Sequence, residues 1–146
     1  MPKFTVEPAE VMRKHKVVAV VGASKNPEKD AYTVPEYLQQ QGYTVIPVNP
    51  TTDSINGLKT YPSLSAIPDE LAKKIEVVDV FRPSEELPEV AKQVVELKKK
   101  TGMPVIFWGQ EDLENEEAKK ILSDAKIEYV MDRCMRVEHR LMERSR

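Results

Sequence analysis

Five consecutive apolar residues, Val17–Val21, followed at once by Gly22, constrain the fold of this chain more than any other stretch. An unbroken run of small and β-branched apolar residues predicts a strand that is buried on both faces. The Gly22-Ala23-Ser24 segment that follows carries little side-chain bulk, so its backbone N–H groups are able to approach an anion closely. Asn26 adds a side-chain donor and Lys29 a charge. The stretch therefore predicts either a phosphate-holding loop or an ordinary strand-to-helix turn that needs glycine only for its dihedral angles.

Further apolar runs alternate along the chain with segments in which apolar residues recur at helical spacing. Strands are expected at residues 43–48, 75–81, 103–108 and 127–131, and helices at residues 8–14, 33–41, 84–100, 115–123 and 135–142. Residues 51–62, which contain the turn signal Asn56-Gly57, are expected to form a loop, and a short helix or turn is expected between Leu64 and Leu71. The alternation predicts an α/β fold with a single Rossmann-like, doubly wound parallel sheet and helices on both faces.

The length and composition of the chain limit the kinds of protein and of binding site that it can form. With 146 residues, of which 40% are hydrophobic, residues 1–146 are expected to form one domain. A net charge of −2 offers no general attraction for nucleic acid or anionic membranes, and the sequence has neither a signal peptide nor an apolar run long enough to span a bilayer. A cytoplasmic location is therefore expected. A single cysteine excludes an internal disulfide, and two histidines do not provide a structural zinc site.

Polar, aromatic and cationic residues stand where the predicted strands end. In a doubly wound sheet the ligand lies outside the carboxyl ends of the strands, so residues at these ends are the candidates for function. They are Gly22-Ala23-Ser24, Asn49-Pro50, Phe81-Arg82-Pro83, Trp108-Gly109-Gln110 and Asp132-Arg133-Cys134. This set predicts a site for an anionic ligand that contains rings.

The first glycine loop does not match the pattern of dinucleotide-binding domains. That pattern needs three glycines in the first turn and an acidic residue after the second strand. Here Gly22 stands alone, and Asn49-Pro50 takes the place of the acidic residue. His15 and His139 also lie away from the strand ends, so no acid–base pair for hydride transfer is evident. An NAD-dependent dehydrogenase is disfavoured.

Five segments in order resemble those of a known family, the small stand-alone CoA-binding proteins, over residues His15 to Leu141. They are G-A-S-x-x-P at Gly22–Pro27, G-Y-x-V-x-P-V-N-P at Gly42–Pro50, V-D-V-F-R at Val78–Arg82, W-x-Q at Trp108–Gln110 and M-D-R-C at Met131–Cys134. The same resemblance extends to the CoA-binding domain of succinyl-CoA ligase alpha subunits. It implies that coenzyme A, or an acyl-CoA, lies across the strand ends.

The resemblance also implies roles for individual residues. The phosphates would be wrapped by Gly22, Ala23, Ser24, Asn26 and Pro27, with Lys29 at a position where relatives have arginine. The nucleotide side would be lined by Asn49 and Pro50, the crevice flanked by Phe81 and Arg82, and the pantetheine arm would pass Trp108, Gln110 and Cys134. The chain departs from its relatives at Asp112, where glycine is common, and at Met135, where proline is common.

Several of these residues also have an ordinary structural interpretation. Trp108 equally fits core packing, Asp132 and Arg133 fit a structural ion pair, and Cys134 fits a small buried apolar side chain better than a reactive thiol. Lys29 and Arg82 are favoured as ligand groups.

The function that follows is a non-catalytic CoA-binding module without metal. One alternative is an acyl- or thiol-transfer enzyme that uses Cys134. Another is a regulatory subunit of a CoA-dependent enzyme, which would have a protein partner; a homo-oligomer is also open.

Overall fold

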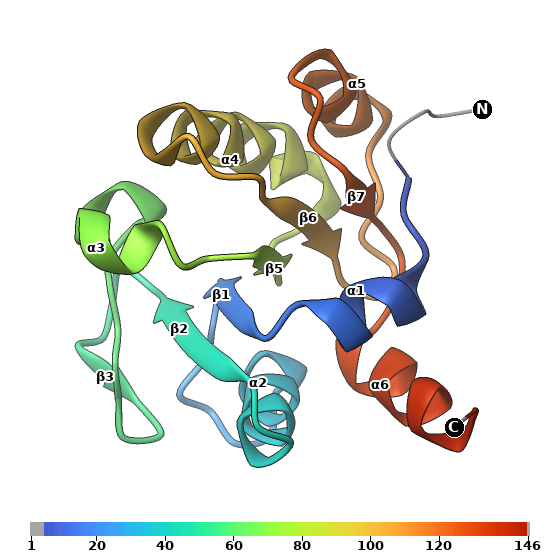
Figure 1. Cartoon of the computed structure of the whole chain (residues 1–146). Helices are drawn as coiled ribbons and strands as arrows, with labels where there is room; N and C mark the ends of the chain where they lie inside the picture. The colour runs from blue at the N-terminus through green and yellow to red at the C-terminus, as the bar shows by residue number, and fades with distance from the viewer. Residues whose placement is uncertain (1–4, 146) are drawn as a thin grey trace.

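A parallel five-stranded sheet with the order β2-β1-β5-β6-β7 forms the centre of the computed structural model, which describes residues 5–145 (Figure 1). Its strands are β1 (Val17–Val21), β2 (Thr44–Val48), β5 (Val77–Val80), β6 (Ile106–Gly109) and β7 (Tyr129–Val130). Because β2 and β5 lie on opposite sides of β1, the direction in which strands are added reverses beside β1. This reversal places a crevice at the carboxyl ends of β1 and β5.

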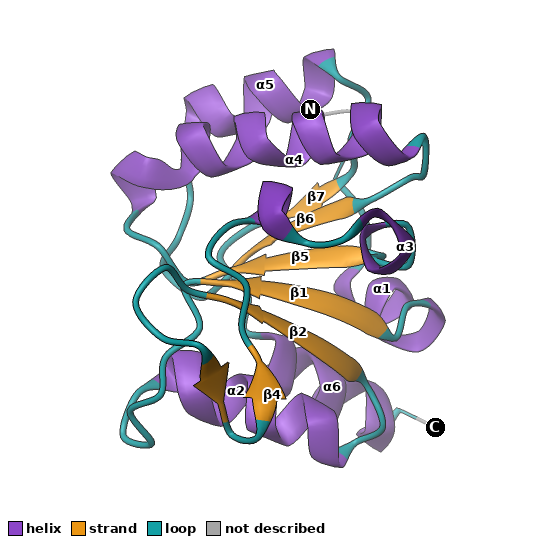
Figure 2. Ribbon diagram, turned by 90° about the vertical axis from the view of Figure 1, so that its left-hand side faces the viewer, coloured by secondary structure: helices purple, strands orange, loops and turns teal. Residues whose placement is uncertain are grey.

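Helices cover both faces of the sheet, which confirms the predicted doubly wound α/β fold (Figure 2). One face carries α1 (Pro8–Lys14), α2 (Asp30–Gln40) and α6 (Met135–Arg144), and the other carries α3 (Asp69–Ala72), α4 (Leu87–Thr101) and α5 (Glu116–Asp124). Alternate residues of one strand supply the two cores: Val18 and Val20 face α2, whereas Ala19 and Val21 face α4. All of these strand residues are buried, as the apolar run predicted.

The segment expected to be a loop contains a small hairpin, β3 (Ser54–Ile55) and β4 (Leu58–Lys59). Its turn is Asn56-Gly57, and both residues have positive φ angles, 53° and 77°. This dipeptide favours such a tight hairpin turn. The buried side chain of Ile55 packs into the core beside α2, which explains why a segment with so little strand pattern is ordered.

Single-residue bridges extend the sheet at both edges. Tyr61 pairs in parallel with Val48 beyond β2, and its N–H donates to the carbonyl oxygen of Pro47 at 3.1 Å. At the opposite edge Thr5 pairs with Tyr129, and Val6 N–H donates to the carbonyl oxygen of Tyr129 at 3.3 Å. With Tyr61 counted, the strand order corresponds to that of a Rossmann sheet whose third strand is reduced to one residue.

Two predicted helix starts are wrong. The helix predicted from Thr33 begins at Asp30, so Pro35 lies inside α2 and not in its first turn. Ser84 was predicted to cap the next helix, but a 3-10 turn, η2 (Ser84–Glu86), precedes α4, and the Ser84 side chain makes no cap hydrogen bond. At the other end Gly102, with a φ of 71°, ends α4 as predicted.

Candidate functional site

A cleft of about 500 Å³ opens between the start of α2 and the carboxyl ends of β5 and β6, beside the point where the order of the strands reverses. It brings together five of the residues predicted from the sequence, namely Lys29, Phe81, Arg82, Gln110 and Cys134. The other residues lining it are Glu28, Asp30, Ala31, Pro83, Glu111 and Leu113. The predicted loop residues that lie next to it but do not line it are Gly22, Ala23, Ser24, Asn26 and Pro27. The cleft is therefore bounded by the β1–α2 loop, the β5 and β6 ends and the start of α6.

Gly22 allows the first loop to run directly against the end of β5. Its φ is +88°, and a Cβ atom built there would lie 2.6 Å from the carbonyl oxygen of Phe81. No side chain fits such a contact, and L-residues rarely adopt this backbone conformation. The glycine is thus required by both a close approach and a dihedral angle, and the contact sets the loop beside Phe81 and Arg82.

Hydrogen bonds within the β1–α2 loop fix its shape. The Ser24 hydroxyl accepts from Asn26 N–H at 3.0 Å, and the Asn26 side-chain oxygen accepts from Glu28 N–H at 3.0 Å. Ser24 N–H donates to the carbonyl oxygen of Ala31 at 3.1 Å. This acceptor has no intrahelical donor four residues on, because Pro35 stands there and has no N–H. The position of the proline inside α2, which was unexpected, therefore leaves the carbonyl open to the loop.

Asn49 links the end of β2 to the same loop. Its amide nitrogen donates to the carbonyl oxygen of Ala23 at 2.7 Å, and its side-chain oxygen accepts from the N–H and the hydroxyl of Thr51, both at 2.7 Å. Neither Asn49 nor the exposed Pro50 lines the cleft. In this structure Asn49 therefore positions the glycine loop.

Two cations lie at the cleft. The Arg82 guanidinium donates through Nε and Nη2 to one carboxylate oxygen of Glu86, at 3.1 and 2.8 Å. Both side chains of this pair are nearly half exposed, so the interaction is weak and exchangeable. Within residues 5–145 the Lys29 ammonium has neither an ion pair nor a hydrogen bond, and Lys29 occupies the N-cap position of α2. The cleft thus holds one unengaged ammonium beside a helix N-terminus and one loosely paired guanidinium.

The structure does not bring Trp108 into the cleft. Its side chain is fully buried, and its indole N–H donates to the carbonyl oxygen of Arg133 at 2.7 Å. Trp108 thus packs in the core, as one of its two interpretations expected, and is not among the residues that line the cleft. Gln110, two residues further on, does line the cleft, and its side-chain oxygen accepts from Met135 N–H at 3.2 Å.

The loops after β6 and β7 hold each other through an aspartate. The side-chain oxygen of Asp132 accepts from Asp112 N–H at 2.7 Å, while the Arg133 guanidinium donates to the backbone carbonyl of Asp132. The two neighbours do not form the ion pair considered from the sequence. Asp112 and Asp132 have φ angles of 70° and 61°, the left-handed region that favours glycine. Asp112 thus keeps the backbone shape that glycine adopts readily.

Cys134 lies at the start of α6, where the helix meets the cleft. The residue is 9% exposed and occupies the N-cap position, and its side chain makes no cap hydrogen bond. It packs in the same core as Val20 and Trp108 and still lines the cleft. The thiol therefore lies at the boundary between core and cleft.

Asp79 is the polar residue that sequence reasoning missed. It lies in the middle of β5, is fully buried, and neither carboxylate oxygen has a hydrogen-bond partner. Burial raises the pKa of this carboxyl well above its ordinary value. The signal in the sequence was the single charged residue inside the apolar run Val77–Val80.

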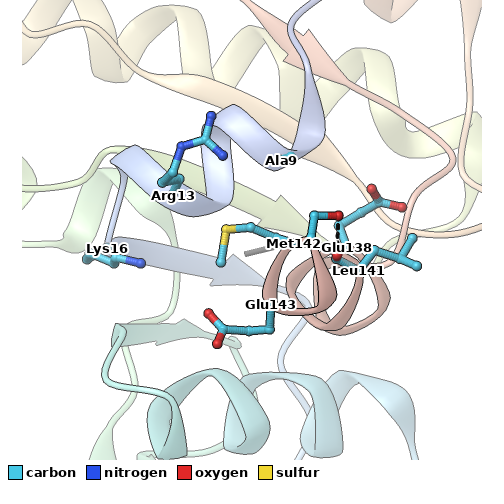
Figure 3. A pocket seen from close by; sticks show the side chains of 8 residues that line it. Ala9, Arg13, Lys16, Glu138, Leu141, Met142 and Glu143 are labelled. Carbon is cyan, nitrogen blue, oxygen red and sulfur yellow. Dashed lines mark hydrogen bonds between the residues drawn. The ribbon is translucent and has the colours of Figure 1, made fainter.

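A second groove, of about 460 Å³, lies between α1 and the C-terminal half of α6 (Figure 3). Its cations are already engaged: Arg13 pairs with Glu10, and the Lys16 ammonium donates to the carbonyl oxygen of Met12 and to the Tyr43 hydroxyl. In the described part of the chain, no cluster of three or more potential metal ligands is present. None of the helices in residues 5–145 has the length and apolarity needed to cross a membrane.

Comparison with known proteins places this geometry in a family. The chain is 41% identical to the uncharacterized protein YneT of Bacillus subtilis over 130 residues, which cover 89% of this chain and 90% of that protein. A hypothetical protein of Pyrococcus horikoshii has a solved structure that superposes with a TM-score of 0.83 at 36% identity, covering 98% of this chain and 96% of the other. Both relatives are of similar length to this chain.

Parts of larger enzymes also match. A stretch of 77 residues is 42% identical to acetate–CoA ligase [ADP-forming] II of Archaeoglobus fulgidus and covers 51% of this chain but only 11% of that enzyme. The family described as CoA binding domain matches residues 16–140, which include every element from β1 to most of α6. The chain therefore belongs to the family of CoA-binding domains.

Proposed function

We propose that the cleft binds coenzyme A or an acyl-CoA, and that residues 1–146 act as one non-catalytic module for this ligand. The observation that carries the proposal is the junction of the Gly22 loop with β5, where low side-chain bulk and two cations meet at the point where the strand order reverses. Backbone N–H groups in such a loop, a helix N-terminus and nearby cations together favour a phosphate-containing ligand.

In this proposal the two ends of the ligand lie at different parts of the cleft. The diphosphate lies over Gly22-Ala23-Ser24 and the Asn26-Pro27 turn, near Lys29 and Arg82, and the nucleotide extends toward Asn49 and Pro50. The pantetheine arm runs past Phe81 and Gln110 toward Cys134, which line the cleft together. Trp108 supports this path from below through its bond to the carbonyl of Arg133 and makes no ligand contact.

The same geometry argues against a dinucleotide. The end of β2 carries Asn49 where dinucleotide-binding domains have an acidic residue for the ribose hydroxyls, and the Asn49 side chain is engaged by Ala23 and Thr51. Neither His15 nor His139 lines the cleft. Binding, and not hydride transfer, is the chemistry that these residues support.

A second candidate function is thiol chemistry at Cys134, because the residue lines the cleft at the start of a helix. A third is a regulatory subunit. The chain is 42% identical over 62 residues to a Pyrococcus furiosus protein called acetate–CoA ligase [ADP-forming] II subunit alpha, of which those residues cover 14%. In this proposal the chain supplies the CoA-binding part of such a reaction and acts together with a protein partner.

Isothermal titration of the purified chain with CoA, acetyl-CoA and NAD tests the proposal. We expect saturable binding of CoA and acetyl-CoA and no binding of NAD, and a thermal shift that grows as the CoA concentration exceeds its dissociation constant. Binding of NAD with no response to CoA would overturn the assignment. A mass measurement with and without CoA shows whether the ligand changes an association with a second copy.

A further inference from the structure

The carboxyl group of Asp79 is the most anomalous polar group in the described part of the chain. Its exposed fraction is 0%, and both side-chain oxygens lack a hydrogen-bond partner. Buried polar groups are almost always hydrogen-bonded, and an unpaired buried charge is strongly disfavoured. An apolar residue at this position would avoid the cost, so stability does not explain the aspartate.

The register of the sheet places this carboxyl beneath the cleft. Asp79 pairs with Val20 of β1 and with Trp108 of β6. Side chains two residues apart on a strand share a face, so the next layer toward the carboxyl edge contains Gly22, Phe81 and Gln110. Phe81 and Gln110 line the cleft. The carboxyl therefore lies one side-chain layer, about 7 Å along the strands, below the cleft floor.

The surroundings of Asp79 hold few groups that could set its charge. β1 and α2 contribute apolar residues to this core, and β6 contributes Ile106 and Trp108. The titratable groups on this side of the sheet are the Cys134 thiol, the buried His139 of α6 and the hydroxyls of Tyr32, Tyr37 and Tyr43. The charged groups above are those of the cleft, namely Glu28, Lys29, Asp30, Arg82 and Glu111. Burial raises the pKa of this carboxyl by more than the neighbouring Val80 backbone N–H lowers it, and no side chain pairs with Asp79. The charge on Asp79 therefore depends on the charges in the cleft and on how much water reaches its floor.

We propose that Asp79 is the residue that couples the affinity of the cleft for an anionic ligand to proton uptake: the carboxyl takes one proton from solvent when the ligand fills the cleft. This inference rests on the proposed function, that is, on CoA as the ligand. Filling the cleft removes water from its floor and brings phosphate charges nearby, and both effects disfavour the carboxylate form. By linkage, CoA then binds more tightly at pH values where Asp79 is protonated before binding, and its affinity falls as the pH rises through the pKa of the empty protein.

The experiment counts protons. CoA is titrated into the parent chain and into Asp79→Asn between pH 6 and 9.5, at each pH in two buffers that differ in ionisation enthalpy, and the difference in heat gives the protons taken up per CoA bound. Protons that belong to CoA itself cancel between the two proteins. Asp79→Val, which matches the neighbouring valines, is the second variant, and Cys134→Ser tests the thiol in the same core.

We expect the parent chain to take up more protons than either Asp79 variant over part of this range, with an excess approaching one proton. We also expect the parent's affinity to lose up to about tenfold per pH unit relative to Asp79→Asn where that excess is largest. Cys134→Ser should keep the excess. Equal proton counts for the parent and a folded Asp79 variant at every pH, with CoA bound by both, would overturn the inference alone. Failure of the parent to bind CoA at any pH would overturn the proposed function and this inference together.

Discussion

The backbone N–H of Ser24 donates to the carbonyl oxygen of Ala31 across a distance of 3.1 Å. Within α2 this carbonyl would normally accept from the residue four positions later, and that residue is Pro35. The proline thus leaves an acceptor inside a helix for the loop that lies beside the cleft, and the bond fixes the first turn of that loop to α2.

Pro35→Ala restores an N–H that competes for the Ala31 carbonyl. We expect the Ser24 amide to exchange its hydrogen faster in the variant than in the parent, as measured by NMR. CoA affinity should also fall by about 0.5 to 1.5 kcal/mol, the net worth of one hydrogen bond. Leu38→Met, a volume-conserving change at a buried position of the same helix, is the control for general loosening of α2. An unchanged exchange rate at Ser24 in Pro35→Ala would contradict the explanation.

Gly22 and Gly42 form a matched pair for testing the close approach at β5. Both have positive φ, +88° and +95°, but only at Gly22 would a Cβ meet another atom, the carbonyl oxygen of Phe81. Gly42→Ala should cost about 1 kcal/mol in free energy of unfolding, from its dihedral angle alone, whereas Gly22→Ala should cost roughly 2 to 4 kcal/mol because the contact adds an overpacking penalty. Urea denaturation measures both. Equal losses would show that the approach to Phe81 imposes no constraint.

Lys29 and Arg82 carry the proposed recognition of phosphate. Lys29→Ala and Arg82→Ala should each weaken CoA binding by about 1 to 3 kcal/mol, the worth of a hydrogen bond to a charged group, with little change in unfolding free energy. The loss at Lys29 should shrink as salt is raised. Lys92→Ala, an exposed lysine on α4, is the control. If all three variants bind CoA as the parent does at low salt, the phosphates lie elsewhere.

The ion pair between Arg82 and Glu86 predicts a variant that should bind CoA more tightly than the parent. Glu86→Gln removes the carboxylate that holds the guanidinium at 2.8 Å, so Arg82 should be more available to the ligand. Titration of this variant should therefore show tighter CoA binding than the parent, and no gain should remain in the double variant with Arg82→Ala.

The environment of His139 leads us to expect that the free energy of unfolding depends on pH. The residue is 4% exposed, its Nδ1 lies 2.7 Å from the Tyr37 hydroxyl, and burial lowers its pKa, an effect that Lys16 reinforces and Glu143 opposes. The unfolded chain therefore binds a proton at His139 more readily than the folded chain does. The contribution of the neutral, buried His139 to the free energy of unfolding is fully present above a pH of about 6.5, and it is lost as the pH falls through the pKa of the folded state.

The measurement is urea denaturation of the parent and His139→Phe at pH 7.5 and pH 5. The parent should lose more unfolding free energy than the variant over this interval. A variant that loses as much as the parent would assign the pH dependence to other groups.

The thiol hypothesis for Cys134 predicts a defined product. Attack of the Cys134 thiolate on CoA disulfide would form a protein–CoA disulfide and release one CoA thiolate. Mass spectrometry should find an adduct of CoA mass that dithiothreitol removes and Cys134→Ser abolishes. A parent chain that binds reduced CoA yet stays unmodified by CoA disulfide would leave Cys134 as a structural residue, in keeping with its 9% exposure.

The strands and most helices of this fold could be predicted from the sequence because long apolar runs and helical spacing leave few alternatives. The role of Trp108 could not be predicted. Trp108 and Gln110 lie on the same face of the chain near the end of β6, and only the path of residues 133–135 over that face decides which of them reaches the cleft. The placement of Pro35 and the partnerless state of Asp79 likewise depend on contacts between segments that are distant in sequence.

The bridges at Tyr61 and Thr5 bear on how copies of this chain meet one another. Exposed edge strands offer unpaired backbone groups to neighbouring molecules and promote edge-to-edge aggregation. At the β2 edge Tyr61 uses the outward carbonyl of Pro47, and proline itself presents no donor there. At the β7 edge Thr5 and Val6 take the corresponding place beside Tyr129. Each edge of the sheet thus has part of its backbone already paired with another segment of the chain, so concentrated protein should be less prone to fibril formation through these edges than a sheet with fully open edge strands.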